Sequence, residues 1–223
     1  MIEKGHYVNK KTNIFKKLKK TLLRYDKILS ARYGVDFSNK IQENAIVYFE
    51  ELIPNIPYYR ASSYQEIILL NAQIIAIIRA MEKQGKTVED TVRIQVELLK
   101  EDYKKIPRFT GRIFISKIGG FFLNKLAKKV TKDGWETDYI KGTPNDDFDV
   151  SIVTKKCGVI EYLKSENMIH YSKYWNFSDF LMFHAMNICL KQPQLIENGK
   201  CVFCMKYKGK SEIPSSLDVV YTK

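Results

Sequence analysis

The stretch DGWETDYIKGTPNDDFDVSIV, residues 133–153, decides the fold that we expect for this chain. Apolar residues alternate or cluster over residues 135–140 and again over 148–153, and the segment between them is rich in turn-forming residues. This pattern is typical of a strand, a turn and a second strand. Because the preceding residues show helical spacing instead, the pair Asp133-Gly134 marks the change from a helical part to a sheet.

Four helices are expected before this point, over residues 12–33, about 39–52, from 63 onward, and from 87 to about 105. Apolar side chains recur at helical spacing in the first of them. Ser63 precedes Glu66 by three residues, and Thr87 precedes Asp90 by three, which is the spacing of a capping box. The helix that begins near Ser63 is apolar on most faces, so we expect it at the centre of the fold.

An apolar stretch, residues 112–130, follows these helices and is interrupted by Gly119-Gly120. Its length falls short of a membrane span, and glycines often permit close helix packing. We therefore expect it to lie in the core, with contact to a membrane or to a ligand path as the alternatives.

Beyond the two strands, residues 157–163 and 171–187 have the pattern of helices, and Leu195 and residues 201–207 that of two further strands. The predicted fold class is α+β, with a mostly helical N-terminal half packed on a small antiparallel sheet that has inserted helices in the C-terminal half. At 223 residues we expect a single domain, residues 1–223. Its helical layer would be residues 1–132, and its α+β portion, carrying the candidate site, residues 133–223.

The chain has 37 lysines and arginines against 25 aspartates and glutamates, a formal net charge of +12. Such an excess favours anionic partners, namely nucleic acid, acidic membrane surfaces and small carboxylates or phosphates. Lysines gather in residues 10–20 and 125–132, whereas arginine, which phosphate and base recognition prefer, is much less frequent. A solvated lysine surface without a specific nucleic-acid partner is therefore expected, and weak association with an anionic surface is the alternative.

Residues 1–11 are polar and no secretory signal follows them. No uninterrupted apolar run reaches the roughly 20 residues that a membrane span needs. We therefore expect a soluble, cytoplasmic protein without a transmembrane segment. In that reducing compartment the four cysteines would be free thiols that are buried, catalytic or metal-bound.

Three groups of polar or thiol residues interrupt the apolar background of the C-terminal part: Cys157-Gly158-Val159, residues 176–179 (Asn-Phe-Ser-Asp) and residues 199–203 (Gly-Lys-Cys-Val-Phe). Thiols and a carboxylate that converge from separate elements can form a nucleophile or a water-activating site. Asn176 and Asp179 would share one face of an apolar helix, which requires partners or a lined cavity. A solvent-facing stripe is the alternative. Burial of Asp179 beside a thiol would raise its pKa and suit it to general acid or base catalysis.

Cys201 and Cys204 have the Cys-x-x-Cys spacing of half a zinc site. In a strand, however, they would point to opposite faces and could share neither a metal ion nor a disulfide. Their separations from Cys157 and Cys189 match no standard zinc spacing. We therefore expect neither a metal nor a cofactor. The three histidines belong to no local motif of a catalytic dyad, so structural roles are favoured for them.

The order of these groups resembles the L-2-amino-thiazoline-4-carboxylic acid hydrolase family, whose C-terminal part carries Cys-Gly-Val-like, Cys-x-x-Asp and Cys-Asp-Phe elements. The likeness is firmest over residues 148–206, at Cys157-Gly158-Val159, Asp179, Gly199, Cys201 and Phe203. It is looser in the helical part, at Ile53-Pro54, Ser63 and Asp133-Gly134-Trp135.

Two departures from the family's pattern matter. Asn176 stands at the Cys of Cys-x-x-Asp, and Val202 at the Asp of Cys-Asp-Phe. Gln192-Pro193 stands where such proteins tend to have Arg-Thr. These changes bear on activity more than on membership of the family.

The resemblance implies a hydrolase that adds water at the amidine carbon of a 2-aminothiazoline carboxylate and opens the ring to a carbamoyl-cysteine. Attack by a thiolate and activation of water by a carboxylate both fit the residue types present. Cys157 or Cys201 would be the nucleophile or a site-forming thiol, and Asp179 the general acid or base. Asn176 would orient the substrate, and Phe203 would contact it. The positive excess of the chain would help to hold the substrate carboxylate.

Two other classes of function stay open. The abundance of aromatic and aliphatic side chains, together with the changed family residues, is compatible with a module that binds a small molecule or a lipid without turnover. Alternatively, the basic helix at residues 10–20 would bind an anionic membrane or nucleic acid, which predicts steep salt dependence.

Overall fold

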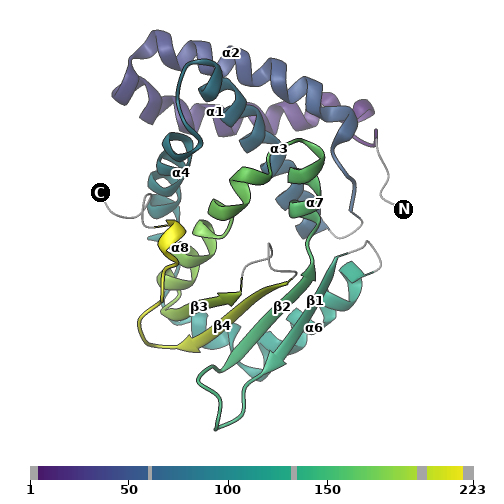
Figure 1. Cartoon of the computed structure of the whole chain (residues 1–223), viewed down its shortest axis with the longest axis vertical. Coiled ribbons are helices and arrows are strands. Elements are labelled where there is room, and N and C mark those ends of the chain that lie inside the picture. Colours follow the sequence, from purple (N-terminus) through teal and green to yellow (C-terminus); the bar gives the residue numbers. More distant parts are fainter. Residues whose placement is uncertain (1–4, 60–61, 132–134, 195–199, 218–223) are drawn as a thin grey trace.

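The computed structural model describes residues 5–59, 62–131, 135–194 and 200–217. A layer of long helices stands on one side of a small antiparallel sheet (Figure 1), which confirms the α+β class. The helical layer is formed by α1 (Lys11–Tyr33), α2 (Val35–Leu52), α3 (Ser62–Lys83) and α4 (Val88–Tyr103). Short 3₁₀ turns occupy Val8–Lys10, Ile53–Asn55 and Ser215–Leu217.

The helix α3 is the centre of this layer, as its apolar sequence predicts. It packs against α2, α4 and α1, and its residues 74–78 are all buried. By length and apolarity its segment Tyr64–Lys83 could cross a membrane, but 67% of that segment is buried inside the fold. Its composition is therefore accounted for by its place in the core. The predicted capping box at Ser63 falls on a side chain outside the described set.

The start of α4 confirms a sequence prediction at the level of single atoms. The Thr87 hydroxyl accepts a hydrogen bond from the Asp90 amide at 3.2 Å, and the Asp90 carboxylate accepts one from the Thr87 amide at 3.0 Å. This reciprocal capping box satisfies two amides that would otherwise lack partners at the helix start. The helix ends at Tyr103, two residues before the predicted end.

Residues 112–130 do not form the buried segment that was expected. They contribute to two helices, α5 (Thr110–Phe114) and α6 (Lys117–Thr131), and α6 runs along β1 (Figure 1). Gly120 is buried against the ring of Tyr139, but Ile113, Phe121 and Phe122 are exposed. The core prediction is therefore wrong for these three side chains, because only one side of each helix meets the rest of the fold.

The sheet contains β1 (Glu136–Lys141), β2 (Val150–Lys156), β3 (Ile188–Gln194) and β4 (Cys201–Tyr207) in the order β1-β2-β4-β3, with every neighbouring pair antiparallel. The first two strands and β4 were predicted. The strand expected around Leu195 was placed too late, since β3 begins at Ile188, and Leu195 itself lies outside the described residues.

Between β2 and β3 the chain forms α7 (Gly158–Ser165), a 3₁₀ segment η3 (Ile169–Tyr174) and α8 (Phe177–Ala185). The single helix predicted over residues 171–187 is therefore wrong, because its first part is 3₁₀ and the α-helix begins only at Phe177. Phe177, Phe180 and Phe183 of α8 are buried. Burial of these rings holds α8 between the sheet and the helical layer (Figure 1).

Candidate functional site

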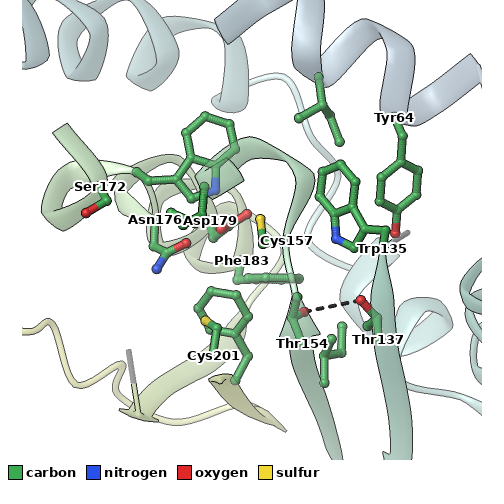
Figure 2. A pocket seen from close by; sticks show the side chains of 15 residues that line it. Tyr64, Trp135, Thr137, Thr154, Cys157, Ser172, Asn176, Asp179, Phe183 and Cys201 are labelled. Carbon is green, nitrogen blue, oxygen red and sulfur yellow. Dashed lines mark hydrogen bonds between the residues drawn. The ribbon is translucent and has the colours of Figure 1, made fainter. Parts of the chain in front are cut away.

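The groups predicted to carry function converge on one cavity. Its volume is about 240 Å³, and its lining includes Cys157, Asn176, Asp179, Cys201 and Phe203. Figure 2 shows the first four of these side chains around the cavity. These five residues come from the start of α7, the turn into α8, α8 itself and β4. The tertiary structure thus brings together every residue that the sequence proposed for catalysis or substrate binding.

The sheet forms one wall through its strand register. Thr154 of β2 is paired with Thr137 of β1 on one side and with Cys201 of β4 on the other. Ile152 is paired with Phe203 in the next row of the same face. All five side chains line the cavity, and the hydroxyls of Thr137 and Thr154 are 3.3 Å apart. Because alternate residues of a strand share a face, this wall follows directly from the pairing.

The first turn of α7 is held in place by a close contact at Gly158. A Cβ on Gly158 would overlap the Tyr59 hydroxyl and lie 2.9 Å from the indole of Trp135. Glycine therefore permits α7 to begin directly against these two rings, and this explains why it follows Cys157. Cys157 is the N-cap residue of α7 and places its thiol in the cavity.

The break before α8 orients the polar side chains. Asn176 is the N-cap residue of α8, and Asp179 lies in its first turn. Asn176 and Ser172 are both buried and line the cavity, so the alternative of a solvent-facing stripe does not hold for them. Asn176, which stands where the family pattern has a Cys, therefore lies within the site.

Asp179 is the acidic group of the cavity lining. Burial raises its pKa from 3.8 to about 7, because the charged carboxylate loses its hydration there. Among the described residues no hydrogen bond or ion pair reaches its side chain to oppose this effect. A carboxyl group that titrates near neutral pH can both accept and return a proton during a reaction.

The two thiols of the cavity are protonated at neutral pH. Burial raises the pKa of Cys157 to about 11, although the backbone amides of Ile160 and Val159 act in the opposite direction. Burial likewise raises the pKa of Cys201 to about 12, and Gln192 partly opposes this by donating a hydrogen bond to its sulfur at 3.2 Å. The charge of Asp179 raises both values further, and all three groups line the same cavity.

Aromatic rings form much of the remaining lining and were not predicted as site residues. Tyr64, Trp135, Trp175 and Phe183 all border the cavity. The rings of Tyr64 and Trp135 meet edge to face, with their centroids 4.3 Å apart, and both lie on the same side of the cavity (Figure 2). Trp135 and Trp175 are the chain's two tryptophans. Their rarity was the signal that sequence reasoning could have used, since large rings dominate small-molecule sites.

Residues on the other face of the sheet stand apart from this cavity. Cys204, three residues after Cys201, borders a different hollow together with Cys189, as strand alternation predicts. Val202 lies between the lining residues Cys201 and Phe203 in β4 and so points to the other face of the sheet. The position where the family pattern has an Asp is therefore outside the site. Gly199 lies beyond the described part of the chain.

The described residues offer no arrangement for a metal or for a histidine-assisted nucleophile. Within them, no three side chains of His, Cys, Asp or Glu are grouped closely enough to hold an ion. His184 lines a separate hollow, and His170 is exposed near Glu82. Neither histidine belongs to the described lining of the main cavity, which contains Asp179 as its acidic group.

Compared with models of protein families, with curated proteins and with solved structures, the chain matches none. The resemblance to the thiazoline hydrolase family therefore stays a prediction that rests on the sequence motifs.

Proposed function

We propose that the protein is a hydrolase that opens a small cyclic amidine, with Asp179 as the general base. The observation that carries this proposal is a carboxyl group with a pKa of about 7 in a small aromatic cavity that also contains two thiols. A base works best when its pKa lies near the working pH. Cyclic amidines of the 2-aminothiazoline class are the substrates that the family resemblance implies.

A carboxylate-activated water is the better nucleophile in this cavity. Transfer of the Cys157 proton to Asp179 would run against a difference of about four pKa units, which corresponds to about 5 kcal/mol. The difference is larger for Cys201. The two thiols therefore act as neutral groups that shape the site, and the alternative of a thiolate nucleophile is disfavoured.

The proposed reaction conserves every proton. Water adds across the C=N bond of the ring: its oxygen bonds to the amidine carbon, and one proton passes through the Asp179 carboxylate to the ring nitrogen. Collapse of this adduct then breaks the carbon–sulfur bond, forms a carbonyl and moves the hydroxyl proton to the leaving sulfur. The carboxylate is regenerated, and the product is a carbamoyl-cysteine. Asn176 is placed to orient the substrate by hydrogen bonding.

Recognition in the cavity favours the amidine end of the substrate. The described lining contains Asp179 and five aromatic rings but neither lysine nor arginine. The neutral amidine would donate an N–H to the carboxylate and lie flat against the ring faces. The volume of about 240 Å³ is below the roughly 300–1,000 Å³ of sites for drug-sized ligands, so a single small ring fits better than a lipid.

The test is hydrolysis of 2-aminothiazoline and of its 4-carboxylate by the purified chain and three variants. Asp179→Asn should lower kcat/KM at least about a hundredfold, since a positioned base contributes that much. Cys157→Ser should retain most of the activity. The matched control is His184→Ala, which changes a titratable side chain of the same helix that faces a different hollow. Full activity of Asp179→Asn, or abolition by Cys157→Ser with folding intact, would contradict the assignment.

Binding without turnover is the second candidate, favoured by the predominantly aromatic lining and by Asn176 at the position of the family's Cys. Because both tryptophans border the cavity, intrinsic fluorescence reports on its occupancy. A saturable change in fluorescence with the same amidines, without any product, would assign the protein to this class. Absence of both turnover and binding would exclude cyclic amidines as its ligands.

A further inference from the structure

The solvent-facing sides of α5 and α6 carry a group of large apolar side chains. Phe109, Ile113, Phe121 and Phe122 are between 55% and 65% exposed. The rings of Phe121 and Phe122 meet edge to face with their centroids 5.8 Å apart. Exposed apolar side chains are ordinary when they are scattered singly, but four within fourteen residues are not.

Packing on the opposite side fixes this orientation. Gly120 is buried, and a Cβ placed on it would lie 2.9 Å from the ring of Tyr139, so the inner face of α6 has no room for a larger side chain. The ring of Phe114 in α5 packs against Phe183 with centroids 5.4 Å apart. Rotation of α6 to bury its phenylalanines would drive them into a gap that does not admit a methyl group. The exposure of Phe121 and Phe122 therefore follows from the way α6 packs on the sheet.

The same segment is strongly basic. Residues 103–132 contain nine lysines and arginines and no aspartate or glutamate. Arg108, Arg112, Lys125 and Lys128 are exposed and form no ion pair with any described residue. Lys125 follows Phe121 by four residues and so lies on the same side of α6.

Two lysines of α1 differ in this respect. Lys11 pairs with Glu50, and Lys17 pairs with Glu66, which neutralises part of the charge on the helix that the sequence first suggested as an anionic contact. Lys16, Lys19 and Lys20 of α1 are exposed and form no ion pair with any described residue, but the exposed large apolar side chain of that helix is a single leucine, Leu23. Exposed aromatic rings therefore coincide with unneutralised positive charge on α5 and α6, not on α1.

We propose that this face of α5 and α6 docks on a membrane surface that contains anionic phospholipids. Its phenylalanines and Ile113 would enter the boundary between head groups and acyl chains, while lysines and arginines contact lipid phosphates. An aliphatic side chain and an edge-to-face ring pair suit hydrocarbon better than the stacked bases of a nucleic acid. The proposal is independent of the chemistry assigned to the cavity.

The experiment is flotation of the full chain with vesicles of phosphatidylcholine alone and of phosphatidylcholine and phosphatidylglycerol in equal parts. We expect binding to the anionic vesicles only, weakened by salt. The double substitution Phe121→Ser/Phe122→Ser should lower the partition coefficient at least about tenfold, because both inserted rings are lost. Lys125→Glu/Lys128→Glu should lower it about as much, through the lost attraction to phosphate.

The matched control is Leu23→Ser on α1, where Leu23 is 67% exposed beside Lys19 and Lys20. It should bind like the unaltered chain, and circular dichroism should show that all variants are folded. The proposal is overturned if the unaltered chain does not bind anionic vesicles, or if Leu23→Ser weakens binding as much as the α6 variants. Binding to single-stranded RNA without binding to vesicles would overturn it as well.

Discussion

Gly158 and Tyr59 approach so closely that a Cβ on the glycine would overlap the tyrosine hydroxyl. Tyr59 is almost completely buried, and Trp135 closes the other side of the same contact, so neither ring can move aside freely. Packing between the helical layer and the start of α7 therefore requires a glycine directly after Cys157.

Gly158→Ala should destabilise the fold by about 1–3 kcal/mol, the usual cost of inserting a methyl group into a filled space. Urea denaturation measures the change in free energy of unfolding. Glu161→Ala, on the exposed side of α7, is the control and should change it by no more than about 0.5 kcal/mol. Equal stability of Gly158→Ala and the unaltered chain would show that α7 can shift away from Tyr59.

Asp179 should make the protein less stable as pH rises. Its pKa is raised from 3.8 to about 7 in the native state, so between these values the native chain binds more protons than the unfolded chain. Stability then falls as pH rises through this window. Asp179→Asn should therefore raise the free energy of unfolding by about 2–4 kcal/mol at about pH 8, and by little at about pH 4.

Denaturation of both forms at the two pH values measures this difference. Asp36→Asn, at an exposed aspartate, is the control, and its effect should stay within about 0.5 kcal/mol at either pH. A pH-independent effect of Asp179→Asn would mean that the carboxyl group is hydrated in the native state.

Cys157 and Cys201 should react slowly with iodoacetamide at neutral pH. Burial raises the pKa of both thiols, to about 11 and about 12, so their thiolate fraction is more than about a hundredfold below that of an unperturbed cysteine. Peptide mapping by mass spectrometry after timed alkylation follows each site separately. A short model peptide that contains one cysteine sets the reference rate. Alkylation of either site at that rate would contradict the protonated state and reopen the thiolate mechanism.

Arg79 joins α3 to the end of α7, and its loss should be costly. Its guanidinium donates to the Glu166 carbonyl at 2.9 Å and to the Glu166 carboxylate at 3.1 Å, and Glu166 is buried. Arg79→Met should cost about 2–4 kcal/mol, because a buried charge is left without its partner. Glu166→Gln combined with Arg79→Met should cost less than the sum of the single changes. Thermal and urea denaturation measure this coupling.

The exposed pair of Lys11 and Glu50 is the control for that cycle. Both side chains are largely in solvent, so Lys11→Met should cost less than about 1 kcal/mol and show little coupling. Additive effects at Arg79 and Glu166 would indicate that the two side chains do not interact in solution.

Local patterns in the sequence determined much of the fold. Helical spacing predicted α1 and placed α3 at the centre, and the spacing of Thr87 and Asp90 predicted a capping box that the structure contains. Strand alternation predicted that Cys201 and Cys204 face opposite sides of the sheet. These features depend on neighbours within a few residues, so the sequence alone specifies them.

Only the tertiary structure decided where the site lies and what it can do. The sequence proposed Cys157, Asp179 and Cys201 together, but their convergence depends on the pairing of Thr154 with Cys201 and on the break before α8. Long-range packing also decides whether a side chain is hydrated. It removes water from Asp179, which raises the pKa of that carboxyl group, and it leaves Phe121 in contact with solvent. Composition could predict an apolar segment at α6, but not which of its sides would find a partner, since burial is a property of the assembled fold.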